Sequence, residues 1–223
     1  MLARFIDTLK NTVNHPSNVI DPFIQEQESR FMHPFKFCLI GILLVVTFNS
    51  FLVDFTIEPT LDMEVGDNEQ MQNAAVWMEA TNIRLLTQFL PIGLLFILVP
   101  AIAIGGNFFL KSKMDGFYSH IILNSYAIGV AIISLLVLIP IWIFLNIPLT
   151  DTFMHSSLPG FLVAVVVVWV QKTYFMARSF LDWIRILSSF VIGYVIFSLL
   201  MNLTGGILGF ISFSISQIVE ALG

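Results

Sequence analysis

The sequence predicts an all-α integral membrane protein, folded as a five-span transmembrane helix bundle. Of its 223 residues, 57% are hydrophobic and 11% are charged, and its mean hydropathy of +0.89 is far above that of ordinary soluble domains. Five apolar stretches are long enough to cross a hydrocarbon layer of roughly 30 Å at about 1.5 Å per residue. They cover residues 35–53, 89–110, 117–145, 158–174 and 186–203.

The basic residues give this bundle an orientation. Nine of the ten Lys and Arg residues fall on one side of the spans, namely Arg4, Lys10, Arg30, Lys36, Lys111, Lys113, Lys172, Arg178 and Arg185. Only Arg84 falls on the other side. The positive-inside rule therefore predicts a cytoplasmic N-terminus and an outside C-terminus. The expected setting is the bacterial inner membrane, with its phospholipid bilayer as the first partner.

Residues 1–34 predict a cytoplasmic lead-in of amphipathic helices. Apolar side chains recur there at spacings of three or four residues, at Leu2, Phe5, Ile6, Leu9 and Val13. This spacing predicts a helix over residues 2–13 with one apolar face. Pro16 ends it, and Ser17 is placed to cap a second helix over residues 18–29. Two placements stay open, because the pair can lie in the headgroup layer or pack under the bundle.

The segments outside the spans carry weaker patterns. The acidic outer loop 54–88 contains a string of acids at 62–69 that only loosely matches a calcium loop, so a solvated loop is the preferred interpretation. Pro140 is expected to kink the third span near its outer end. The apolar tail 204–223 is expected to continue the fifth span as a helix, or to lie along the outer surface, rather than to cross a sixth time.

Polar residues inside the spans are few. The span cores contain no ionisable residue, which disfavours transport coupled to protons or sodium. Asn49, Asn124 and Tyr126 are the main polar candidates, and such groups usually form hydrogen bonds between helices. The alternative is a small transporter, or a transporter subunit, in which Asn124, Tyr126 and nearby Ser residues line a cavity among the third to fifth spans.

The cytoplasmic face carries the main candidate contacts. Six residues there are expected to meet phospholipid headgroups or a partner protein, namely Arg30, His33, Lys36, Lys111, Lys113 and His120. Arg178 and Asp182, four residues apart on the inner linker, are expected to pair with each other. The leading hypothesis is thus a non-enzymatic scaffold or accessory subunit, with a membrane-protein partner or a second copy as further possibilities.

Enzymatic motifs are absent from the sequence. It has no Gly-x-Ser-x-Gly, His-Glu-x-x-His or glycine-rich phosphate loop, so no catalytic, cofactor-binding or metal-binding residue is predicted. Cys38 is the only cysteine and is expected to be a buried apolar residue. No nucleic-acid partner is expected. A lipid-modifying enzyme that uses His33 or His120 at the inner interface is the least favoured alternative.

The lead-in also carries a resemblance. It reads His15-Pro16-x-x-Val19-Ile20-x-x-Phe23-Ile24, then Arg30-Phe31-x-x-Pro34-Phe35-Lys36-Phe37 directly into the first span, and Gly116-Phe117-Tyr118-Ser119-His120 opens the third. These elements resemble an uncharacterised family of bacterial multi-pass membrane proteins, many of which begin with a zinc ribbon that this chain lacks. The five-span layout is also similar to Yip-type membrane proteins, which implies a scaffold. Both resemblances imply an architecture and leave the reaction and substrate open.

Overall fold

The computed structural model describes residues 1–52, 74–75, 77–78, 81, 90–146, 154 and 157–222, with side chains described from 1 to 48 and from 157 to 215 at the two ends. Every regular element in this part of the chain is helical. Most of the acidic loop 54–88, including Arg84 and the acids at 62–69, lies outside the described residues. The side chain of Asn49 lies outside them too.

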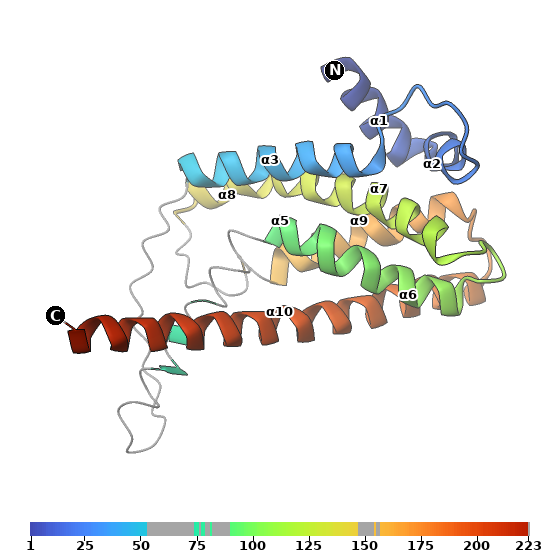
Figure 1. Cartoon of the computed structure of the whole chain (residues 1–223). Helices are drawn as coiled ribbons and strands as arrows, with labels where there is room; N and C mark the ends of the chain where they lie inside the picture. The colour runs from blue at the N-terminus through green and yellow to red at the C-terminus, as the bar shows by residue number, and fades with distance from the viewer. Residues whose placement is uncertain are drawn as a thin grey trace.

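The helices form an elongated bundle around α7, Phe117–Leu135 (Figure 1). Its packed neighbours are α3 (Pro34–Leu52), α6 (Val99–Phe109) and α9 (Leu158–Tyr174). The last helix, α10 (Phe180–Leu222), packs mainly on α6. Because α7 is enclosed on three sides, its side chains from Ile122 to Ile132 are all buried, and the hydrophobic core follows this helix.

Three helical stretches are long and apolar enough to cross a membrane: Leu90–Phe109, Phe117–Phe144 and Phe180–Ile215. Two further apolar helices, Pro34–Phe48 and Leu158–Tyr174, are shorter. All five lie where the sequence predicts a span. The chain is therefore a helical membrane protein by length and composition.

Two of these stretches are interrupted before a proline. The first consists of α5 (Leu90–Gly93), a π-helical turn η1 (Leu94–Leu98) and α6, which begins one residue before Pro100. Proline has no N–H to donate to the carbonyl four residues back and its ring crowds that carbonyl, so the preceding turn widens. The π-turn is a feature that the apolar pattern did not predict.

The third predicted span is also interrupted before a proline, Pro140, but here the turn tightens. Helix α7 ends at Leu135 and α8 covers Leu138–Phe144, with a tight turn at Leu136 and Val137 between them. The carbonyl that Pro140 cannot bond belongs to Leu136. The helix is therefore interrupted one turn before the proline, near the position where a kink was predicted.

Helix α10 runs without a break from Phe180 to Leu222, so the tail continues the helix of the fifth apolar stretch. Its 43 residues span about 65 Å, roughly twice the thickness of a hydrocarbon layer. It approaches α6 closely, because a Cβ on Gly105 would lie 2.6 Å from the Ser189 carbonyl oxygen and one on Gly193 would lie 2.7 Å from Ile102 Cα. Small residues thus fix this helix pair.

The lead-in forms two helices, α1 (Leu2–Asn14) and α2 (Pro16–Ile24). The second is shorter than predicted and starts earlier. Pro16 occupies its first turn, where a fixed φ and a missing N–H cost nothing, and the predicted Ser17 cap is wrong because His15 precedes the helix. The helix ends before Glu26, whose φ of 55° is left-handed.

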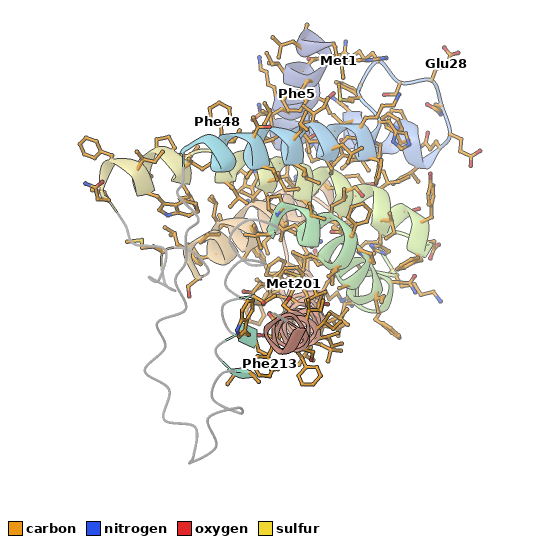
Figure 2. All side chains as sticks on the ribbon, turned by 60° about the vertical axis from the view of Figure 1, so that its left-hand side comes forward. Met1, Phe5, Glu28, Phe48, Met201 and Phe213 are labelled. Atoms are coloured by element: carbon orange, nitrogen blue, oxygen red, sulfur yellow. The ribbon has the colours of Figure 1, made fainter. Side chains whose placement is uncertain are left out.

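The two lead-in helices pack on the flank of α7 and α9. Val19 and Ile20 are fully buried, and the Phe5 ring lies 5.2 Å from the Phe37 ring. Figure 2 shows Met1 at the free tip of α1, beyond α3, with Phe5 closer to the bundle. The Tyr126 hydroxyl donates to the Met32 carbonyl at 2.6 Å and holds the turn into α3.

Candidate functional site at the basic end of the bundle

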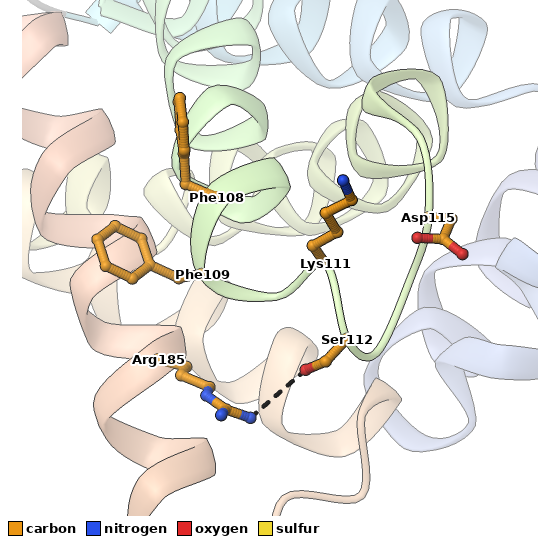
Figure 3. A pocket seen from close by; sticks show the side chains of 6 residues that line it. All are labelled: Phe108, Phe109, Lys111, Ser112, Asp115 and Arg185. Atoms are coloured by element: carbon orange, nitrogen blue, oxygen red, sulfur yellow. Dashed lines mark hydrogen bonds between the residues drawn. The ribbon is translucent and has the colours of Figure 1, made fainter.

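A shallow pocket of about 760 Å³ lies where α6 ends and α10 begins. It is lined by Phe108, Phe109, Lys111, Ser112, Asp115 and Arg185 (Figure 3). Five of these residues come from the end of α6 and the loop to α7, whereas Arg185 comes from the second turn of α10. We call this the α6–α10 pocket, and we call the end of the bundle that carries it the basic end.

An ion pair fastens the loop at residues 110–116 to α10. Lys113 Nζ lies 3.2 Å from Asp182 Oδ1, and the Asp182 amide donates to Ser179 Oγ at the start of the helix. Asp182 therefore pairs with Lys113 and not with Arg178, which corrects the predicted pair. Lys113 was predicted as a headgroup contact, and its ion pair with Asp182 also positions the loop.

Two bases remain to face the pocket. Arg185 Nη1 donates to Ser112 Oγ at 3.4 Å, a long hydrogen bond that leaves most guanidinium donors unused. Lys111 is exposed and makes no ion pair or side-chain hydrogen bond with any residue that the structure describes. A lysine and an arginine with donors to spare, beside a serine hydroxyl, form a natural site for a phosphate group.

The pocket has an apolar side as well. Phe108 is 76% exposed and Phe109 is 37% exposed, and Figure 3 shows both rings on the side of the pocket away from Lys111 and Asp115. The loop returns into α7 at Gly116, whose φ of 88° is strained for any residue with a Cβ. One pocket thereby combines apolar rings with charged groups, and Arg185 lies on the same side as the Phe109 ring.

The other predicted contacts do not join this pocket. Arg30 is exposed and lines a separate shallow pocket of about 470 Å³ beside α2, and its guanidinium lies 4.9 Å from the Phe31 ring centre. His33 is exposed, with its ring against Phe23 and Nδ1 accepting the Phe35 amide. Lys36 is exposed on the first turn of α3. The structure thus distributes the predicted residues over several places.

His120 is not a surface residue. It is fully buried near the start of α7, and its Nε2 lies 3.2 Å from the Met114 carbonyl oxygen, to which it donates. Its Nδ1 has no hydrogen-bond partner among the described residues and packs on Gly106. This position leaves His120 no surface at which to contact a headgroup, which corrects that expectation.

The polar residues of the spans bond to one another. Gln171 Nε2 donates to Asn124 Oδ1 at 2.7 Å, and Asn124 Nδ2 donates to the His120 carbonyl oxygen at 2.8 Å. All three side chains are buried. Gln171 did not stand out in the sequence, although a glutamine inside seventeen mostly apolar residues was a readable signal. These bonds make Asn124 and Gln171 a link between α7 and α9.

Searches of protein-family models, curated proteins and solved structures found no match to this chain.

Proposed function

We propose that this chain is a five-span protein of the bacterial inner membrane that binds a phospholipid at its cytoplasmic face, in the α6–α10 pocket. Its role is that of a lipid-binding scaffold or accessory subunit without a reaction of its own. One observation carries the proposal. Lys111 and Arg185 have unused N–H donors that can bind a phosphate, and they line the same pocket as the exposed Phe108 ring. A lipid offers the matching combination, a phosphate beside acyl chains.

The distribution of charge supports the orientation. The basic end gathers the loop bases Lys111 and Lys113, the start of α10 with Arg185, and the lead-in helices (Figure 1). Lys111, Lys113 and Arg185 belong to the nine bases that the positive-inside rule places in the cytoplasm.

An aromatic cluster indicates where the inner membrane interface crosses the bundle. Lys172 Nζ lies 4.9 Å from the Trp169 ring centre and 5.6 Å from that of Trp183. Indole rings favour the headgroup level of a membrane, and a lysine at a helix end reaches toward the same level. This cluster and the α6–α10 pocket flank the same short connection between α9 and α10, so the pocket is at the depth where lipid phosphates lie.

The buried polar residues favour this role over transport. Tyr126, Asn124 and Gln171 are buried and donate to protein acceptors. Hydrogen bonds of this kind typically hold transmembrane helices together. The pockets at the lead-in and at the α6–α10 junction are shallow surface features.

The test is lipid binding by a charge-removed variant. Purified protein carrying Lys111→Gln and Arg185→Gln is titrated with a mixed phospholipid extract in detergent, and bound lipid is counted by native mass spectrometry. We expect an apparent affinity roughly 10- to 30-fold lower than wild type, since each base near a lipid surface contributes about 1 kcal/mol.

A matched control separates the pocket from general charge. Lys10→Gln with Arg178→Gln removes two exposed bases that the sequence places on the same side but that do not line the pocket. This control should bind lipid nearly as wild type does. Equal loss in both double variants, or no loss in either, would contradict a lipid site in the α6–α10 pocket.

A further inference from the structure

The α6–α10 pocket contains a carboxylate that a purely anionic ligand would avoid. Asp115 lines the pocket together with Lys111 and Arg185. It is exposed, and it forms no ion pair or side-chain hydrogen bond with any residue that the structure describes. The pocket therefore presents two cations and one unpaired anion to whatever enters it.

The Asp115 carboxylate and the Arg185 guanidinium lie apart within the pocket. Figure 3 shows Arg185 and Ser112 at one edge of the pocket and Asp115 across the loop from them, while the Lys111 side chain extends away from Arg185. Lys113, the remaining base of the loop, is already held by Asp182 at 3.2 Å, so it does not neutralise Asp115. An occupant that satisfies all three free groups must carry a negative group and, a short distance away, a positive one.

We propose that the occupant is a phospholipid whose headgroup carries a primary ammonium, of the phosphatidylethanolamine class. This inference rests on the proposed lipid-binding function and names the headgroup. The phosphate lies against Arg185 and Ser112, the exposed Lys111 side chain turns toward it, and the ammonium donates to the Asp115 carboxylate. The acyl chains leave past the rings of Phe108 and Phe109.

Asp115 is the residue that selects among headgroups. A primary ammonium has three N–H donors for a carboxylate, whereas the quaternary ammonium of phosphatidylcholine has none. The glycerol headgroup of phosphatidylglycerol carries no positive charge, so it leaves Asp115 unpaired beside the lipid phosphate. A carboxylate near a phosphate repels it, which disfavours this lipid in turn.

The experiment compares three lipids with identical acyl chains: phosphatidylethanolamine, phosphatidylcholine and phosphatidylglycerol. Each is titrated separately into the purified full-length protein, and bound lipid is counted by native mass spectrometry. Wild type should favour phosphatidylethanolamine by about threefold over each of the others, the size expected for one exposed ion pair. Asp115→Asn should abolish this preference and strengthen binding of phosphatidylglycerol, while Asp115→Glu should retain the preference.

The control removes an exposed acid outside the pocket, on the lead-in. Glu28 is exposed on the loop after α2 (Figure 2) and does not line the α6–α10 pocket, so Glu28→Gln should leave the headgroup preference unchanged. If binding needs Lys111 and Arg185 but wild type and Asp115→Asn show the same headgroup order, the headgroup inference is overturned and the lipid site stands. If no lipid binding depends on Lys111 and Arg185, the proposed function and the inference both fall.

Discussion

At the scale of single residues, the contact between Gly106 and His120 shows how tightly the basic end is packed. The imidazole is fully buried and its Nε2 donates to the Met114 carbonyl, which fixes the ring in place. A Cβ added to Gly106 would lie 2.6 Å from His120 Nδ1. The glycine is therefore required by the histidine ring, and the pair joins the end of α6 to the start of α7 directly behind the pocket loop.

We expect Gly106→Ala to lower the free energy of unfolding by about 1–3 kcal/mol, the usual cost of overpacking a filled core. The ring cannot move aside without giving up its bond to Met114. Thermal unfolding in detergent, followed by circular dichroism, measures the change. Gly206→Ala is the matched control, because its Cβ would meet only the flexible Met78 methyl group at 3.3 Å. An unfolding temperature for Gly106→Ala equal to that of the control would refute the packing argument.

At the scale of elements, helix α1 shows one of the two placements that its sequence left open, because it packs on the bundle. Phe5, Thr8 and Thr12 face the bundle and are buried, and Thr8 Oγ1 accepts the Met32 amide at 3.0 Å. Leu2 is 72% exposed and Ile6 is 53% exposed on the neighbouring face. The helix thus packs on the bundle along one face and leaves an apolar stripe beside it. Such a stripe is suited to the boundary between headgroups and acyl chains.

This stripe can be tested with spin labels. In a Cys38→Ala background, a label at Ile6→Cys should be more accessible to oxygen, which concentrates in hydrocarbon, while a label at the exposed Asn14→Cys should be more accessible to an aqueous nickel chelate. Electron paramagnetic resonance of the protein in liposomes measures both accessibilities. The same aqueous accessibility at the two positions would mean that α1 lies in water.

The apolar pattern predicted the existence and type of these elements well, and their ends and faces less well. Periodicity placed α1, and the apolar runs placed α3, α9 and α10, because hydrophobic spacing depends only on local sequence. It assigned Leu2 and Ile6 to the same face as Phe5, although the bundle buries Thr8 and Thr12 instead. Contacts with α7 and α9 decide that choice, and no pattern within α1 contains them.

At the scale of the whole molecule, the α6–α10 pocket depends on contacts between residues far apart in the sequence. Lys111 was a candidate from the sequence, but Arg185, Asp115 and Phe108 were not. Arg185 lies 73 positions beyond Ser112, its partner, and the close packing of Gly105 on Ser189 and of Gly193 on Ile102 helps to bring the two helices together. The sequence could predict a basic inner face, and the fold was needed to show which bases share a pocket.

We infer that the basic end, with this pocket, faces the cytoplasm. Two Ser→Cys substitutions in a Cys38→Ala background test it, one at Ser112 in the pocket and one at the exposed Ser157, before α9 at the opposite end. A membrane-impermeant maleimide is applied to bacterial cells that produce each variant. The account predicts labelling of the Ser157 variant in intact cells and of the Ser112 variant only after permeabilisation. Labelling of the Ser112 variant in intact cells, with the Ser157 variant protected, would contradict the account.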